Sequence, residues 1–337
     1  MDYSPRLITL GLLTRDFILS ENGTSYEDVP GGEALYSAAG MGFMGEKPGV
    51  CARISELYPQ DWLEIFETKG IDTTGVLIKP EINDVIRFIT FLNAETISTE
   101  NPLTHYARFG KQVPKALLGY TNPAQQTDSQ NQAADVFIRS TEIPPAYLDA
   151  IGAHLCGMDY LSYMNILHIL KQGNTRTISI NPGPGMMNAL FFDRFPDLIR
   201  DVTIFHTSET RIKQLFSGKT GDLWEMASEV SRWGAEFVVI RRGNQGQFLF
   251  DRASSKRWMI PAYPNQPMNS LGAGGVLCGA FLADYQQKYD PLRACLMGSI
   301  AASFAIEGTS PLYLLDALPD LVEMRYRKLH EMVQEFQ

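Results

Sequence analysis

Cysteine and histidine are scarce in this sequence, and their spacing excludes the common metal sites. The 337 residues include four cysteines and five histidines. Cys51, Cys156, Cys278 and Cys295 stand far apart in apolar stretches, and no CxxC or HxxC spacing is present. Zinc sites usually need such close pairs. We therefore expect four reduced, buried thiols in a cytoplasmic protein.

Long apolar runs and clusters of positive charge are also missing. No apolar run approaches the roughly 20 residues that cross a membrane, and the first segment, MDYSPRLITLGLL, lacks the order of a signal peptide. The chain has a net charge of −9 and no run of lysine or arginine. Nucleic acids and anionic lipids are bound through basic surfaces. We therefore expect neither nucleic acid nor a membrane as a partner.

Apolar residues make up 45% of the chain and charged residues 20%, which is the balance of a globular protein with a large core. Short apolar segments alternate with amphipathic ones, and this predicts a parallel sheet with helices on both faces. The predicted strands are Leu7–Leu13, Pro48–Ile54, Val76–Ile78, Val85–Leu92, Ala153–Cys156, Thr177–Ile180, Val202–Phe205, Glu236–Ile240, Gln247–Phe250 and Trp258–Pro261. The predicted helices are Glu33–Met44, Asp61–Lys69, Tyr160–Lys171, Phe192–Ile199, Glu209–Phe216, Leu223–Trp233, Val276–Tyr285, Leu292–Ala305 and Pro319–Phe336. The polar segment Gly119–Asp135 predicts a loop.

Three glycine-containing segments are candidate binding sites. The first, NSLGAGG at 269–275, precedes a strongly apolar predicted helix. Small residues at a helix N-terminus expose backbone N–H groups and the positive end of the helix dipole, so this segment predicts a phosphate or oxyanion site. A tight turn before a buried helix explains the same residues. The segment is not a dinucleotide fingerprint, because Leu277 stands where the third glycine is required.

The other two glycine segments also allow two interpretations each. The segment RRGNQG at 241–246 follows a predicted strand, at the strand end where α/β proteins usually bind ligands. A plain hairpin turn is the alternative. The pair Gly31 and Gly32 precedes a predicted helix and would let a ligand approach the backbone closely. Here too a simple turn is the alternative.

One histidine differs from the others in its setting. His206 follows the apolar stretch VTIF and begins the segment HTSE, with Glu209 three residues later. A polar side chain and a carboxylate at a strand end predict a group that faces a metal-bound phosphate. A helix cap formed by the intervening threonine or serine accounts for the segment equally well. His154 and His168 lie in apolar contexts and are predicted core residues.

Taken in order, these segments resemble the PfkB, or ribokinase-like, carbohydrate and nucleoside kinases from Leu7 to Gly308. The resemblance implies a ribokinase-like three-layer α/β sandwich with a mostly parallel central sheet and a small β-sheet lid. The lid would come from about residues 17–30 and 76–110 of a domain spanning 1–312, and residues 313–337 would form a C-terminal helix packed on that domain. The forms GGEALYSAAG and GSIAASFAIEGTSP look most like an offshoot branch of the family found in fungi.

The resemblance also implies roles for individual residues, with ATP and Mg²⁺ as cofactors. Substrate would be bound by Asp16, Gly31, Gly32, Glu33 and Tyr36. Near the nucleotide would lie Glu209, Arg242, Gly243, Gly246 and Asn269, with Glu209 contacting Mg²⁺ through water. The catalytic positions would be His206 and the anion hole Gly272, Ala273, Gly274 and Gly275. The implied partners are a small-molecule substrate and a second copy of the chain, paired through the lid.

Four polar positions depart from the family's pattern. Gly275 stands where the family has the aspartate that takes the proton from the attacking hydroxyl. The other three departures are Asn269, His206 and Tyr36. Because a general base contributes about 10²–10⁴-fold, we expect at best a slow sugar or nucleoside kinase, with Glu33 or Asp16 as the substitute base. Two alternatives stay open: a catalytically silent protein that binds a nucleotide or metabolite, and a different reaction in the same cleft built around His206 and Tyr36.

Overall fold

The computed structural model describes residues 4–93, 96–122, 127–265 and 270–336. Ten strands form one large sheet, and those from β5 to β11 run parallel to their neighbours while β12, β13 and β14 are antiparallel. Their order is β14 (Gln334–Phe336), β13 (Arg257–Ile260), β12 (Gln247–Asp251), β11 (Phe237–Arg241), β10 (Ile204–Ser208), β9 (Thr177–Asn181), β8 (Gly152–Cys156), β1 (Leu7–Leu10), β4 (Gly49–Ile54) and β5 (Asp72–Ile78). The predicted mostly parallel sheet is confirmed.

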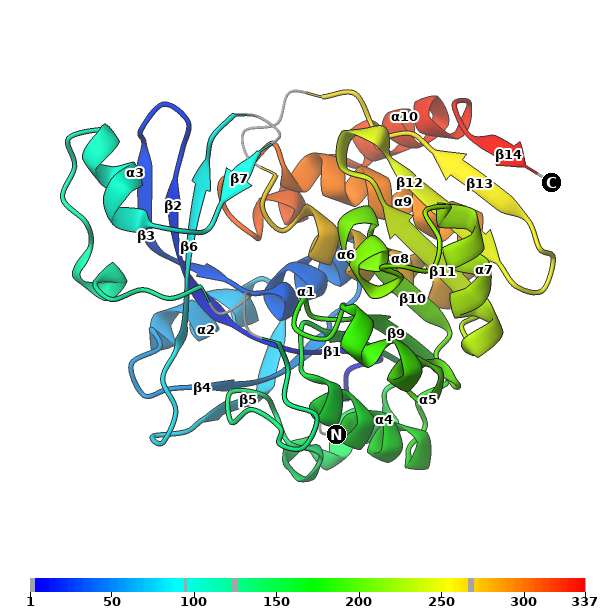
Figure 1. The fold of residues 1–337 in the computed structure, drawn as a ribbon, viewed down its shortest axis with the longest axis horizontal. Coiled ribbons are helices and arrows are strands. Elements are labelled where there is room, and N and C mark those ends of the chain that lie inside the picture. The colour runs from blue at the N-terminus through cyan, green and yellow to red at the C-terminus, as the bar shows by residue number, and fades with distance from the viewer. Residues whose placement is uncertain (1–3, 94–95, 123–126, 266–269, 337) are drawn as a thin grey trace.

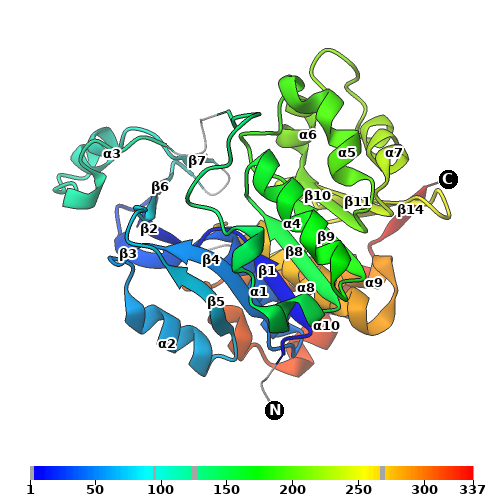
Figure 2. The same cartoon turned by 90° about the horizontal axis from the view of Figure 1, so that it is seen from below.

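Helices cover both faces of this sheet. Successive residues of a strand point to opposite faces, so both faces carry apolar side chains that helices bury. In β10, Ile204 belongs to the hydrophobic cluster of one face and Phe205 to that of the other. One face carries α1 (Glu33–Phe43), α2 (Gln60–Thr68), α8 (Ala273–Lys288), α9 (Pro291–Ala305) and α10 (Pro319–His330). The other carries α4 (Tyr160–Gln172), α5 (Phe195–Ile199), α6 (Glu209–Leu215) and α7 (Leu223–Trp233). The result is the predicted three-layer sandwich, seen from two sides in Figures 1 and 2.

A second, four-stranded sheet projects from one side of the sandwich (Figure 1). Its strands lie in the order β3 (Ser25–Gly31), β2 (Thr14–Leu19), β6 (Val85–Phe91) and β7 (Ile97–Ser98), and α3 (Pro102–Arg108) packs against it through Tyr106. Residues 76–78, expected in this lid, lie instead in β5 of the large sheet. The reason is topological: α2 carries the chain back so that β5 pairs in parallel with β4.

The C-terminal segment also differs from its prediction as one helix over Pro319–Phe336. Helix α10 ends at His330, and the chain then forms β14, which pairs antiparallel to β13. An edge strand offers unpaired backbone groups, and β14 satisfies them on β13. The described parts of the predicted loop 119–135 contain neither a helix nor a strand, and residues 123–126 lie outside the described residues.

Two composition-based expectations can be compared with the structure. All four cysteines are buried and free, as predicted. Within the part of the chain that the structure describes, no helix is long and apolar enough to span a bilayer.

His154 is a core residue, as predicted, but His168 lies exposed on α4, so that prediction was wrong. The apolar residues around His168 belong to the buried face of an amphipathic helix, and the histidine stands on its opposite face.

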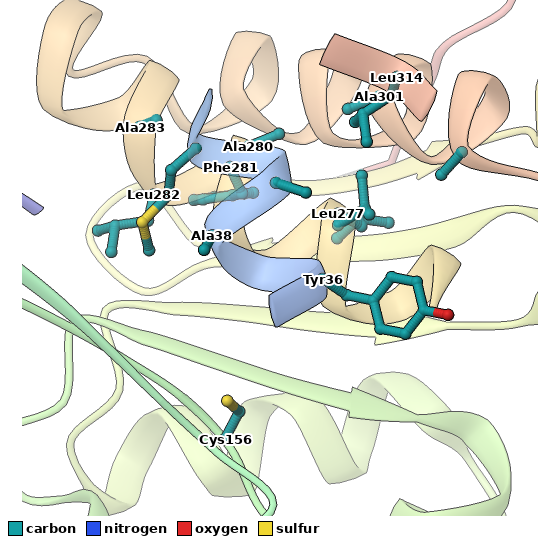
Figure 3. Close-up of a cluster of buried hydrophobic side chains, with 14 of the residues drawn as sticks. Tyr36, Ala38, Cys156, Leu277, Ala280, Phe281, Leu282, Ala283, Ala301 and Leu314 are labelled. Carbon is teal, nitrogen blue, oxygen red and sulfur yellow. The ribbon is translucent and has the colours of Figure 1, made fainter. Parts of the chain in front are cut away.

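Helices α1 and α8 approach each other unusually closely, and this contact positions the site described below. A Cβ atom on Gly40 of α1 would overlap the carbonyl oxygen of Val276, and one on Gly279 of α8 would overlap that of Ser37. Figure 3 shows the two helices crossing, with small side chains such as Ala38 and Ala280 in the interface. Because backbone meets backbone here, neither helix can shift to admit a larger side chain without cost.

Candidate functional site

A surface cavity of about 630 Å³ lies at the carboxyl ends of β10 and β11. These strands are parallel neighbours, so their carboxyl ends open at the same edge of the sheet, where α/β proteins bind ligands. We call this cavity the α6 pocket. Its lining residues are Ser208, Glu209, Thr210, Lys213, Gln214, Ser217, Arg241, Arg242, Gly243 and Gln245. The sequence-predicted residues Glu209, Arg242 and Gly243 are therefore brought together.

Glu209, the first residue of α6, is held by two cations. Its carboxylate accepts a hydrogen bond from Lys213 Nζ at 2.5 Å and another from Arg242 Nε at 3.0 Å. These bonds lower the pKa of Glu209, so it is ionised at neutral pH. Each carboxylate oxygen already has a positively charged partner. The residues present therefore do not fit the expected water-mediated contact between Glu209 and Mg²⁺.

The turn after β11 is a hairpin turn that also lines part of the α6 pocket, so it has features of both interpretations of the segment 241–246. Arg242 N donates to Gly246 O at 2.8 Å, which closes the hairpin between β11 and β12. Gly246 has a φ of +82° and no room for a Cβ against Ile260, so it is a turn residue and not among the described lining residues of the pocket. Gly243 lines the pocket, and the Arg242 guanidinium lies 4.5 Å from the centre of the Phe248 ring.

Arg241, at the end of β11, connects the α6 pocket to the interior. Its Nη2 donates to Asn181 Oδ1 at 2.8 Å, its Nε to Thr207 O at 3.3 Å, and its Nη1 lies 3.4 Å from Cys278 Sγ. The Asn181 amide in turn donates to Glu33 Oε1. Arg241 begins the candidate segment 241–246 but had no predicted role of its own, and Asn181 was not among the predicted site residues. Both directly follow predicted strands, Thr177–Ile180 and Glu236–Ile240, and that position was the signal that could have identified them.

Glu33 begins α1, directly after Gly32, whose φ of +102° a residue with a side chain rarely adopts. Burial raises the pKa of Glu33, while the nearby guanidinium groups of Arg211, Arg241 and Arg87 oppose that rise. Burial therefore favours the neutral form of this carboxyl group, and the arginines counteract that effect in part. Of the two candidates for a substitute base, Glu33 is the one whose carboxylate lies in the network of Arg241.

The predicted anion hole forms the first turn of α8, and Asn269 lies outside the described residues. Gly272 caps the helix with a φ of +75° and lies under the ring of Tyr36, where any Cβ would overlap the ring. Ala273 is the first helical residue. A Cβ on Gly274 would stand 2.6 Å from Arg241 Nη1. The start of α8 therefore faces a guanidinium on one side and Tyr36 on the other.

Gly275 is tightly enclosed by α1. A Cβ at this position would lie 2.9 Å from Tyr36 Cβ, 3.3 Å from Glu33 O and 3.5 Å from Glu33 Cγ. The first two distances are shorter than ordinary van der Waals contact. The absence of a side chain at Gly275 thus has a packing reason, and the nearest acidic side chain to this position is that of Glu33.

Asp16 lies in β2, a strand of the small sheet, and is completely buried. Its carboxylate accepts hydrogen bonds from Thr14 Oγ1 at 2.7 Å and from Nε and Nη2 of Arg87, the Nε bond being 2.9 Å long. Gly31 leaves room for this pair, because a Cβ there would overlap the carboxylate. We call Asp16, Glu33, Tyr36 and Arg87 the α1 cluster. Burial and the charge of Asp16 raise the pKa of Tyr36, which stays neutral.

His206 does not reach this site, which corrects its predicted role. Strand β10 runs on to Ser208, so His206 lies inside the sheet with 0% of its surface exposed. The centre of its ring lies 5.3 Å from that of Phe281 and 6.0 Å from that of His154. Neither ring nitrogen has a hydrogen-bond partner among the described residues. Burial lowers the pKa of His206 well below its usual value. The helix-cap alternative holds for Ser208, whose Oγ accepts from Arg211 N at 3.3 Å.

The geometry separates one of the three functional hypotheses from the other two. Tyr36 and Glu33 flank Gly275, but His206 contacts α8 at Phe281, more than one turn further along the helix. A different reaction built around His206 and Tyr36 therefore loses its histidine. The α6 pocket, Arg241 and the α1 cluster, by contrast, form one connected set of polar groups.

The chain is similar in sequence to a nucleoside kinase and to a sugar-acid kinase. The chain is 23% identical over 290 residues to a cytidine kinase of Thermococcus kodakarensis, covering 86% of this chain and 91% of the relative. It is 24% identical over 341 residues to a 5-dehydro-2-deoxygluconokinase of Lacticaseibacillus casei, covering 94% of each.

The solved structures extend the likeness to the fold. An E. coli protein of the ribokinase type, solved with ATP and Mg²⁺, superposes with a TM-score of 0.70 at 16% identity, covering 96% of this chain and 99% of that one. The model of the pfkB carbohydrate kinase family matches residues 5–317. The special likeness to a fungal branch stays a prediction. The chain belongs to the pfkB family of carbohydrate kinases.

Proposed function

We propose that this protein is a slow kinase that transfers a phosphoryl group from ATP to a hydroxyl of a small sugar-like or nucleoside substrate. The observation that carries the proposal is the continuity of the site through Arg241. Its side chain lines the α6 pocket, lies against Gly274, and reaches Glu33 through Asn181. A nucleotide in the pocket and an acceptor beside the α1 cluster would thus meet at the start of α8.

The charges near this junction suit a phosphoryl group. Arg241 and Arg211 both act on Glu33, and Arg241 lies beside the first turn of α8, where the helix dipole is positive. One carboxylate does not balance these positive groups. A phosphoryl group in transit would carry negative charge into this place, and phosphoryl transfer relies mainly on such positioning and electrostatic stabilisation.

Glu33 is the proposed proton acceptor. The acceptor oxygen would form a bond to the γ-phosphorus, the bond from that phosphorus to the bridging oxygen would break, and ADP would leave. The hydroxyl proton would pass to a Glu33 carboxylate oxygen and from there to solvent. Asp16 is less suited, because Arg87 already binds its carboxylate in two hydrogen bonds. Glu33 Oε1 is also shared with Asn181, which makes it a weaker base and supports slow turnover.

Activity assays with a defined acceptor panel test the proposal. ATP would be offered with cytidine, 5-dehydro-2-deoxygluconate and ribose, and ADP release and acceptor phosphorylation would be followed together. The expected result is slow, acceptor-dependent turnover that Glu33→Gln lowers by about 10²-fold or more. Acceptor-dependent turnover that survives Glu33→Gln would eliminate Glu33 as the base.

A catalytically silent, nucleotide-binding protein is the second candidate. The empty side-chain position at Gly275 favours it, because no carboxyl group stands where the family has its base. The same panel separates the two: this candidate binds ATP but phosphorylates no acceptor. A homodimer paired through the small sheet and a location in the cytoplasm also stay predictions.

A further inference from the structure

The α6 pocket is positively charged although the chain as a whole is acidic. Lys213, Arg241 and Arg242 line it together with Glu209, the one carboxylate among its described lining residues. The whole chain has a net charge of −9. In this lining, positive side chains therefore outnumber the single carboxylate, although acidic residues outnumber basic ones in the whole chain, and such a pocket favours an anionic ligand.

The three cations differ in how firmly the fold holds them. Arg242 bonds Glu209, donates to Gln245 Oε1 at 2.5 Å and covers the Phe248 ring. Arg241 is fixed by Asn181 and Thr207. Lys213 has the most freedom, with 48% of its side chain exposed. Two guanidinium groups are thus placed in advance, and only the lysine must be ordered when an anion binds.

The described lining of the α6 pocket offers no comparable set of ligands for a magnesium ion. Both Glu209 carboxylate oxygens already accept a hydrogen bond from a cation, Lys213 on one and Arg242 on the other, so metal-bound water would have to share an oxygen with a positively charged donor. No three His, Cys, Asp or Glu side chains within the described ranges are grouped so that they could hold a metal ion. A divalent cation brought in with a ligand would also add positive charge beside three cations, and like charges repel.

We propose that the α6 pocket binds the polyphosphate of a nucleoside di- or triphosphate as the metal-free anion, with Lys213, Arg241 and Arg242 neutralising it. This inference rests on the proposed nucleotide site. Metal-free ATP carries more negative charge than its magnesium complex, so it matches the pocket better. Transfer from a nucleotide held in this way would be slow, in agreement with the missing base at Gly275.

Calorimetric and thermal-shift titrations of the full chain with ATP test this inference, once with excess EDTA and once with excess MgCl₂ at equal ionic strength. We expect ATP to bind in EDTA at least as tightly as in MgCl₂. Glu209→Gln should tighten binding in EDTA by roughly threefold to tenfold, because it removes the negative charge from the pocket. Arg242→Gln should weaken it by about tenfold.

A matched control and the contrary outcomes complete the design. Arg232→Gln removes another arginine that pairs with a glutamate, Glu229 on α7, and it should leave ATP binding unchanged. If ATP binds only with Mg²⁺, and Glu209→Gln weakens that binding, the inference is wrong and the proposed kinase function stands. If the folded chain binds ATP under neither condition, the proposed function fails as well. Unchanged ATP binding by Arg242→Gln would show that the ligand lies elsewhere.

Discussion

The α1 cluster and the α6 pocket lie on either side of Arg241, yet they are built in opposite ways. In the α1 cluster, Asp16 is fully buried, the neighbouring Gly275 of α8 is enclosed by α1, and little can move without loss of packing. In the α6 pocket, charged side chains such as Lys213 and Glu209 pair at a partly exposed surface. The comparison teaches that substitutions at the buried pair Asp16 and Arg87 should act mainly on stability, and those in the α6 pocket mainly on binding.

The largest effect is expected from Arg87→Met. This change leaves the fully buried Asp16 without its charged partner, and breaking a buried ion pair costs about 3–5 kcal/mol of unfolding free energy. Lys213→Gln breaks an ion pair of the α6 pocket, which is a partly exposed pair four residues apart and should cost about 0.3–0.5 kcal/mol. Urea unfolding measures both. Equal losses would refute the contrast between the two regions.

The core that supports both regions should respond to acid. Burial lowers the pKa of His154 to about 3 and that of His206 well below its usual value, so both are neutral in the folded state. Below about pH 6.5 the unfolded chain binds protons that the folded chain does not. Stability is therefore complete above that pH and falls as pH drops, by about 1.4 kcal/mol per pH unit for each histidine.

His206→Phe isolates one of these two contributions. It should remove half of the histidine-dependent loss, as seen in unfolding free energies measured between pH 7 and 5. His168→Gln, at an exposed site on α4, serves as the control and should leave the slope unchanged. A slope that His206→Phe does not alter would mean that His206 is protonated in the folded protein.

A smaller effect is expected from placing at position 275 the aspartate that the resemblance to the family implies. Gly275→Asp places a side chain against Tyr36 and the backbone of Glu33, and such overpacking costs about 1–3 kcal/mol. Gly221→Asp, where a Cβ would meet no atom within 4 Å, should change stability by less than about 0.5 kcal/mol. Thermal unfolding compares the two variants. A stable Gly275→Asp variant with faster phosphoryl transfer would show that α1 yields at this point.

Local patterns predicted much of the secondary structure, because apolar periodicity and capping residues act over a few neighbours. Helix α7 has its predicted bounds, Leu223–Trp233, and Asp222 caps it as a short polar residue before an apolar run should. Strand β14 was not predicted. Its residues, Gln334–Phe336, become a strand only because the edge of β13 is beside them.

The candidate site shows the same difference between what local sequence patterns determine and what tertiary contacts determine. The sequence alone determined the glycine segments, the strand end that leads into Arg241, the helix start at Glu209, and the absence of a carboxylate at position 275. Only the tertiary structure decided that His206 faces the core, that Asn181 joins Arg241 to Glu33, and that Glu209 is occupied by two cations. The physical reason is that burial and ion pairing depend on which distant segments meet, and no local pattern records those meetings.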